Sequence, residues 1–238
     1  MKSMGKKDKT FTIKDFEKGL MLAGYISPKN EAEIAEREAL ELLEKKQAKE
    51  KQIIYFKRAV LAAEIVSQLH NEFTFGRVKF QKIVYLCEKA SDMQLQNRYA
   101  KLAAGPFDHK FMHSINNEFK KQKWFDVKID RNSQYQKPVY TAAEKNDKFK
   151  EYYQKYFSNN DEKIQYIINL FRKEKTRETE LIATIYACWE EIILKGLDFN
   201  SENLFDLFYS WADEKKKFNQ DEIIGAVEWM KEKGITPA

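Results

Sequence analysis

Apolar residues between 75 and 90 recur at i, i+3, i+4 and i+7, the spacing of one face of an α-helix. These positions are Phe80, Ile83, Val84 and Cys87. Polar residues fall on the other side of the same helix, namely Lys79, Gln81, Lys82, Glu88 and Lys89. The pattern therefore predicts an amphipathic helix with its polar side turned away from the apolar stripe.

A second helix is predicted downstream, with Met112, Ile115 and Phe119 as its apolar stripe. Asp108 stands where a helix N-cap is expected, because its carboxylate can accept hydrogen bonds from free backbone N–H groups. Lysines at 120, 121 and 123 suit the negative end of the helix dipole.

The region before residue 70 predicts two helices, a short one over 11–25 and a long one that begins near Pro28. Residues 31–70 contain no Gly or Pro and are rich in Ala, Glu, Lys and Leu. The apolar seam of this long helix is interrupted at Lys46 and Lys49 and resumes at Ile53. We expect the later half to pack on the core, and the earlier half to project or to pair with another helix, such as that of a second copy.

Residues 124–141 give the only strong strand signal in the sequence. Phe125, Val127 and Ile129 alternate with charged residues, and the polar run 131–134 precedes a second short extended segment. Thr141 and Glu144 have the spacing of a capping box ahead of an aromatic helix. The remaining sequence predicts helices, the last of them opened by Asn219 and Glu222 and stopped by Gly234.

The predicted fold class is mainly α: a helical bundle-like body, one small β-hairpin near 124–141 and a long projecting N-terminal helix. We expect three parts. Residues 1–52 form a helical extension, residues 53–157 a helical domain with the hairpin, and residues 158–238 a helical part packed on it.

Composition adds limits on class and location. Apolar residues make up 43% of the chain and aromatic residues 14%, typical of a globular protein. No run of 18 apolar residues and no secretory signal is found, so we expect no membrane association. Cys87 and Cys188 lie on apolar helix faces and predict buried free thiols, which favours the cytoplasm.

Charge is distributed unevenly along the chain. Residues 1–150 hold 30 Lys and Arg against 20 Asp and Glu, a net charge of +10, whereas residues 151–238 hold 12 against 17, a net charge of −5. The two parts could dock on each other or on a charged partner, or the basic part could bind DNA. The candidate nucleic-acid-binding residues are Arg77, Lys79, Lys82, Arg98 and Lys101.

The sequence contains no recognisable catalytic or cofactor-binding motif. His109 and His113 are four residues apart, but Lys110 occupies the position at which a zincin helix carries glutamate. The two cysteines lack the spacing of a zinc or redox pair. We expect no bound metal, no cofactor and no enzymatic activity.

Two short motifs carry a family resemblance. The first is Lys79-x-Gln81-Lys82 followed by an aliphatic pair and Tyr85; the second is Gly105-Pro106-Phe107-Asp108. Together they resemble the Panacea (SocA-like) antitoxin domain. The Phe-Asp continuation after Gly-Pro is similar to a variant found in the C-terminal region of type I restriction specificity subunits.

The resemblance implies a helical, non-enzymatic module that binds a protein, either a toxin or a restriction–modification subunit. Carried over position by position, the partner-binding residues are Lys79, Gln81, Lys82, Tyr85, Gly105, Pro106, Phe107 and Asp108. The alternative function is a nucleic-acid-binding accessory module of a restriction–modification system. The Gly-Pro pair is expected to form a turn that sets the angle between two helices.

Overall fold

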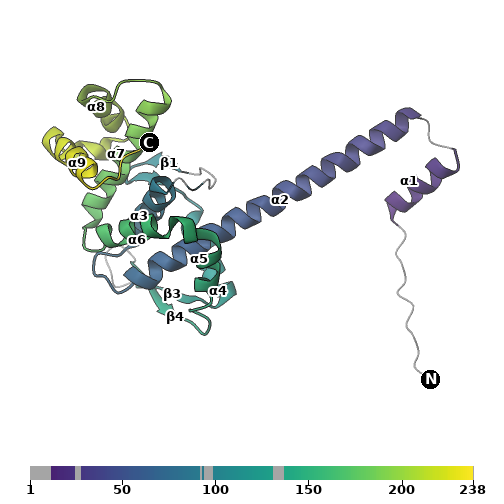
Figure 1. Cartoon of the computed structure of the whole chain (residues 1–238), viewed down its shortest axis with the longest axis horizontal. Helices are drawn as coiled ribbons and strands as arrows, with labels where there is room; N and C mark the ends of the chain where they lie inside the picture. The colour runs from purple at the N-terminus through teal and green to yellow at the C-terminus, as the bar shows by residue number, and fades with distance from the viewer. Residues whose placement is uncertain (1–11, 25–27, 92, 94–98, 131–136, 238) are drawn as a thin grey trace. The chain divides into compact units, whose positions relative to one another are not determined.

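The computed structural model describes residues 12–24, 28–91, 93, 99–130 and 137–237. The fold is mainly α, as the sequence predicts, with two small antiparallel hairpins (Figure 1). The helices are α1 (Ile13–Leu22), α2 (Pro28–Leu69), α3 (Arg77–Ala90), α4 (Phe111–Gln122), α5 (Phe149–Phe157), α6 (Asp161–Phe171), α7 (Thr176–Leu194), α8 (Ser201–Tyr209) and α9 (Gln220–Glu232). Two short 3-10 helices, Ser158–Asn160 and Asp213–Lys217, are also present in the described residues. Within the described residues, no helix combines the length and the apolar character that crossing a lipid bilayer requires.

The chain divides into two compact units, residues 1–53 and residues 54–238. The first contains α1 and the N-terminal part of α2, which run antiparallel and are joined by ion pairs. Lys14 lies 3.0 Å from Glu41, and Arg37 pairs with Glu17. A capping box at Thr12 and Asp15 opens α1. The predicted further division near residue 157 stays a prediction.

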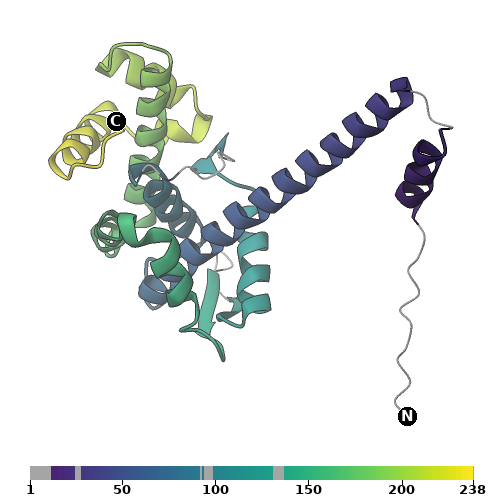
Figure 2. The ribbon, with the colours of Figure 1, turned by 45° about the vertical axis from the view of Figure 1, so that its right-hand side comes forward.

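The second unit is built around α3. This helix packs against α6 and α7, and α8 and α9 pack in turn on α7 (Figure 2). The apolar stripe predicted for α3 is buried, but so are Lys79, Gln81, Lys82 and Glu88 on its polar side. The expected solvent-facing side is therefore wrong over these positions. Elements that cover α3 on more than one side take its polar groups into the interior.

The predicted hairpin near 124–141 is confirmed. It consists of β3 (Phe125–Asp130) and β4 (Lys137–Ala142), paired antiparallel with Phe125 opposite Ala142. Residues 131–134 lie outside the described residues. Phe125 is buried and packs on the rings of Phe119 and Phe149.

A second hairpin was not predicted. Strand β1 (Ala100–Leu102) pairs antiparallel with β2 (Gly105–Phe107), so Gly105 and Pro106 lie in a strand and not in a turn between helices. The predicted N-cap at Asp108 is also displaced. Helix α4 begins at Phe111, and the Asp108 carboxylate accepts a hydrogen bond from the Lys110 backbone N–H at 3.0 Å.

The outcomes at other helix ends are mixed. The capping box predicted at Thr141 and Glu144 is wrong, because Thr141 lies in β4 and Glu144 pairs with Lys123 at 2.6 Å. The capping box at Asn219 and Glu222 is confirmed at the start of α9. The prediction of buried free thiols at 87 and 188 is also confirmed.

Replacing Phe80 tests the packing of the core at the centre of the second unit. Its fully buried ring lies 5.4 Å from that of Phe75, 5.6 Å from Phe111 and 5.9 Å from Tyr140. We expect Phe80→Ala to lower the free energy of unfolding by about 3–5 kcal/mol, because it removes buried contacts and leaves a cavity. Phe73→Ala is the matched control, since Phe73 is 95% exposed, and should change stability by less than about 0.5 kcal/mol. Urea unfolding with similar losses for both variants would contradict this assignment of the core.

Candidate functional site

The two halves of the family-like motif meet in space. The Lys82 ammonium on α3 donates a hydrogen bond to the carbonyl oxygen of Pro106 in β2. The backbone N–H of Asp108 donates to the Gln81 side-chain oxygen at 3.3 Å. We call the buried group around this junction, namely Lys82, Gly105, Pro106, Glu180, Thr184 and Lys215, the hairpin cluster.

Gly105 is required at its position for two reasons. Its φ of +88° lies in the left-handed region that favours glycine. A Cβ atom added there would lie only 2.5 Å from the Thr184 hydroxyl oxygen on α7. The absence of a side chain thus allows the β1–β2 hairpin to lie directly against α7.

Two lysines are buried together in the hairpin cluster. The Lys215 ammonium donates to Glu180 at 2.8 Å and to the Thr184 hydroxyl at 3.0 Å, so its charge is compensated. The Lys82 ammonium donates to the Pro106 carbonyl, and no carboxylate in the described part of the chain lies in salt-bridge contact with it. Burial, together with the nearby Lys215, lowers the pKa of Lys82 to about 7.

Lys79 lies in a separate place and joins α3 to the connection between α6 and α7. Its ammonium donates to the Thr74 hydroxyl at 2.6 Å and to the carbonyl oxygens of Arg172 at 3.0 Å and Glu174 at 2.6 Å. Burial lowers its pKa to about 8. These three acceptors occupy all three ammonium protons, so Lys79 has a structural role here.

A second polar group surrounds Arg58 of α2. The guanidinium donates to Glu88 of α3 and to Asp108, both at 2.8 Å, and to the Tyr99 hydroxyl at 3.1 Å. The Tyr99 hydroxyl donates in turn to Glu88 at 2.9 Å. Burial raises the pKa of the Glu88 carboxyl, and the neighbouring Arg58 offsets this only in part. Three elements that are distant in sequence are thus joined through one guanidinium.

Tyr85 and Trp211 complete the surroundings of the hairpin. The Tyr85 hydroxyl donates to Glu190 of α7 at 3.0 Å, and its ring lies edge-on to Tyr99 with 4.8 Å between centroids. The Trp211 indole N–H donates to the Leu102 carbonyl oxygen in β1 at 2.9 Å. The hairpin is therefore held from α3, from α7 and from the segment that follows α8.

Most of the predicted partner-binding residues have buried side chains. Lys79, Gln81, Lys82, Tyr85, Gly105, Pro106 and Asp108 are all buried, and Phe107 alone of the eight is half-buried. A direct contact between those seven residues and a partner is thus not compatible with this structure, because each is enclosed by the protein's own elements. Gln81, Lys82, Gly105, Pro106 and Asp108 hold the hairpin in place, whereas Lys79 joins α3 to the α6–α7 connection.

Phe107 is at the surface with two exposed neighbours. The Arg77 guanidinium lies over its ring, 5.7 Å from the centroid, and His109 lies edge-on at 5.4 Å between centroids. Both Arg77 and His109 are exposed. We call Arg77, Phe107 and His109 the Phe107 face.

The structure removes part of the support for the alternative hypothesis that the basic residues bind nucleic acid. Lys79 and Lys82 are buried and already bonded, so neither can contact a phosphate. Arg98 lies outside the described residues. Arg77 and Lys101 are exposed, and Lys101 already pairs with Glu191. The four described residues of this set therefore do not form one basic surface.

The two histidines are not arranged as the sequence suggested. His109 precedes α4, while His113 is inside it and is bonded to the Asn117 side chain at 3.0 Å. Across the described ranges, no group of three or more His, Cys, Asp or Glu side chains is placed to hold a metal ion.

Sequence reasoning missed Arg58, Glu180, Thr184 and Lys215 as partners of the motif. For Arg58 a signal was present: a single arginine directly before the apolar run 59–63, on a helix expected to pack on the core. A charge in such a run requires a buried partner. Lys215 carried no such signal, because it stands among the charged residues 213–217.

Comparisons of the chain with protein-family models, with curated proteins and with solved structures give no match.

Replacing Gly105 tests the close approach of the hairpin to α7. We expect Gly105→Ala to lower the free energy of unfolding by more than about 2 kcal/mol, because left-handed strain is added to a clash with Thr184. Gly196→Ala is the matched control: its φ is +65° with no atom within 4 Å of the added Cβ, so only the strain of about 1–2 kcal/mol applies. Equal losses in urea unfolding would show that the hairpin is not held against α7.

The lowered pKa of Lys82 predicts a pH-dependent stability. Between pH 7 and the unfolded value of 10.5, the unfolded chain keeps the Lys82 proton and the folded chain releases it, so stability rises with pH. Each pKa unit is worth about 1.4 kcal/mol, so the wild type should gain up to about 3 kcal/mol over Lys82→Met between pH 7 and about pH 9.5. Lys101→Met, at an exposed position, should show no such relative change. A constant difference between wild type and Lys82→Met at the two pH values would contradict the assignment.

Proposed function

We propose that this chain is a non-enzymatic protein-interaction module, antitoxin-like, that acts in the cytoplasm in a defence or restriction–modification context. The observation that carries the proposal is the junction of the two motif halves. The two segments behind the Panacea resemblance meet at the β1–β2 hairpin, where Lys82 donates to the Pro106 carbonyl and the Asp108 N–H donates to Gln81. A resemblance that rested on chance would not require these two segments to contact each other.

The environment of the reactive groups supports a non-enzymatic role. Both thiols are buried, and burial raises the pKa of Cys87 well above its ordinary value and that of Cys188 to about 12. Neither thiol is therefore poised as a nucleophile. The buried Lys79 and Lys215 ammonium groups donate to acceptors of the protein itself.

The Phe107 face is the part of the motif region through which a partner would bind. It offers an aromatic ring flanked by Arg77 and His109, and aromatic and arginine side chains are common at binding hot spots. Its base is held by the hairpin cluster, so the face is preorganised before a partner arrives. In this proposal the buried motif residues fix the geometry, and Phe107 and its neighbours make the contact.

An affinity pull-down from the native host tests the proposal. We expect a specific protein to be captured at moderate salt and retained at high salt. The variant Arg77→Glu with His109→Glu should capture at least about ten-fold less of it, equivalent to about 1.4 kcal/mol, because both substitutions lie on the Phe107 face. The variant Lys128→Glu with Lys163→Glu is the control, at exposed positions outside that face.

Three results would contradict the proposal in different ways. Capture of nucleic acid that washes off with salt, and of no protein, would favour the nucleic-acid alternative. Equal capture of one protein by all variants would keep the interaction role and exclude the Phe107 face. Turnover of a substrate by the purified chain would exclude the non-enzymatic role.

A further inference from the structure

Residues 32–53 of α2 form a helical segment without a buried side chain. From 32 to 53 every residue is exposed except Ile34 and Glu41, which are half-buried. Most of the stability of a protein helix comes from packing one apolar face against something else. This segment therefore lacks the covering that such a helix normally has.

The exposed side chains include large apolar ones. Leu40, Leu42 and Leu43 are 56%, 71% and 51% exposed. Ala39 and Leu43 are four residues apart and share one side of the helix, with Leu40 and Leu42 on the two flanks of that side. We call these four residues the leucine face. A helix that is exposed to solvent on all sides is normally polar on all sides, so leucines on this side indicate a missing contact.

Helix α1 does not cover the leucine face. It lies against the side of α2 that carries Ile34, Glu38 and Glu41, as the ion pairs from Lys14 to both glutamates show. At about 100° of rotation per residue, Leu43 lies nearly opposite the middle of that side. The leucine face is thus left open on a helix that already has one neighbour.

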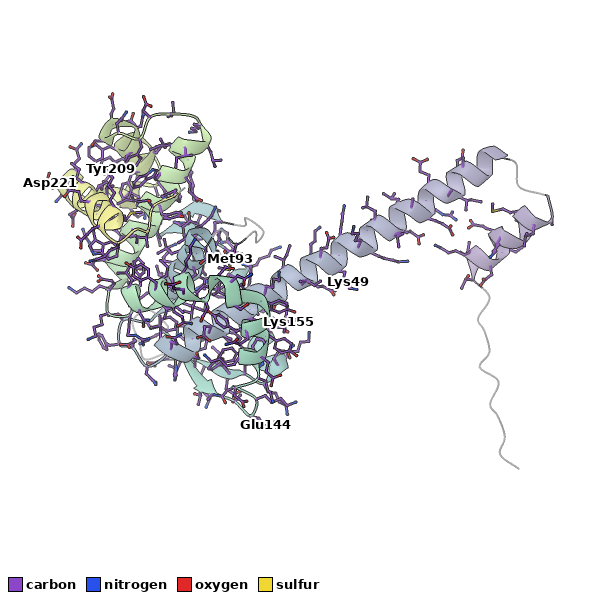
Figure 3. The ribbon with its side chains drawn as sticks, viewed as in Figure 1. Lys49, Met93, Glu144, Lys155, Tyr209 and Asp221 are labelled. Carbon is purple, nitrogen blue, oxygen red and sulfur yellow. The ribbon has the colours of Figure 1, made fainter. Side chains whose placement is uncertain are left out.

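The charges along this part of α2 fall into two blocks of opposite sign. Residues 33–44 hold five glutamates and one arginine, a net charge of −4, and residues 45–51 hold four lysines and one glutamate, a net charge of +3. Glu33, Glu36 and Glu44, and likewise Lys46, Lys49 and Lys51, form no ion pair with another described residue. Figure 3 labels Lys49, whose side chain extends from α2 into solvent.

This arrangement of charge is complementary to itself when the helix is reversed. If a second α2 lies antiparallel along the leucine face, the acidic block of each copy, with a net charge of −4, lies beside the basic block of the other, with a net charge of +3. The exception is the contact of Glu36 with Glu50 of the other copy. The crossing point of such a pair lies near Leu43, so the leucines of the two copies meet in the middle. A parallel pair would instead place like charges side by side, which is unfavourable. The antiparallel pairing is also closed, with the same surface on both chains, as a two-fold dimer requires.

We propose that residues 32–53 of α2 form a homodimer with a second copy of this chain, antiparallel, with Ala39 and Leu43 at the seam and Leu40 and Leu42 beside it. The occupant of the exposed face is thus a second copy. This inference concerns a surface other than the Phe107 face and does not depend on the proposed function.

The first test is the mass of the full-length chain in sedimentation equilibrium between about 1 and 100 µM. We expect the wild type to dimerise in this range. Leu40→Glu with Leu43→Glu should weaken the dimer at least about ten-fold, because both charges would enter the apolar contact. Leu194→Glu is the control, since Leu194 is an 86% exposed leucine on α7, and should leave the dimer unchanged. A monomeric wild type at the highest concentration, or a dimer of the double variant with unchanged affinity, would overturn the proposal.

The second test addresses charge complementarity. In one variant the glutamates at 33, 36 and 44 are replaced by lysine, and in the other the lysines at 46, 49 and 51 are replaced by glutamate. Each variant alone should be monomeric, because its two blocks then carry the same sign. An equimolar mixture should recover a heterodimer, and a mixture that stays monomeric would contradict charge-directed pairing.

The third test fixes the direction of the two helices. Chains with Glu36→Cys and chains with Glu50→Cys are treated with a short bismaleimide, separately and mixed. Positions 36 and 50 are each seven residues from Leu43, so the antiparallel pairing brings position 36 of one copy close to position 50 of the other, and only the mixture should give covalent dimers. In the separate samples the two thiols would lie about 21 Å apart along the helix axis.

Efficient covalent dimers in the separate samples would show a parallel arrangement and overturn the antiparallel pairing. The native Cys87 and Cys188 are buried, which limits their background reaction.

Discussion

One buried guanidinium connects the parts of the second unit on which the rest depends. Arg58 bonds at the same time to α3 through Glu88 and to the exit of the β1–β2 hairpin through Asp108. A buried charge of this kind is costly unless each of its hydrogen bonds is made. Here the surrounding carboxylates and Tyr99 meet that requirement, and their positions are fixed in return. The register of α2 against α3, and the position of the hairpin, are thus set by one side chain.

The sequence predicted the helices well and the polar interior poorly. The 42-residue α2, the β3–β4 hairpin and the capping box at Asn219 follow from local patterns, since each depends on neighbouring residues. The burial of Lys79 and Lys82 does not, because it depends on acceptors 95 and 24 positions away. The sequence did not predict the β1–β2 hairpin for a similar reason. Each strand has only three residues, and their pairing depends on Gly105 fitting against Thr184 of α7.

For the candidate site, the sequence identified which segments belong together but not what they do. Lys82, Gly105 and Pro106 do form one group, as their shared motif implied. Their side chains or backbone are enclosed, however, so the recognisable residues are those that build the hairpin cluster. Beside them, Arg77 and His109 are exposed.

The position of Trp211 gives the molecule an internal optical reporter. Its indole N–H bonds to Leu102 in β1, the residue is 8% exposed, and the Lys101 ammonium lies 5.1 Å from the ring centroid. An indole in such a place emits at shorter wavelength than one in water, and a cation beside the ring alters the energy of its excited state. Any event that lifts the hairpin from its supports, such as docking of a ligand, heating or a change of pH, would break all three conditions together. Trp211, one of four tryptophans in the chain, therefore contributes a component of the fluorescence that reports on the hairpin.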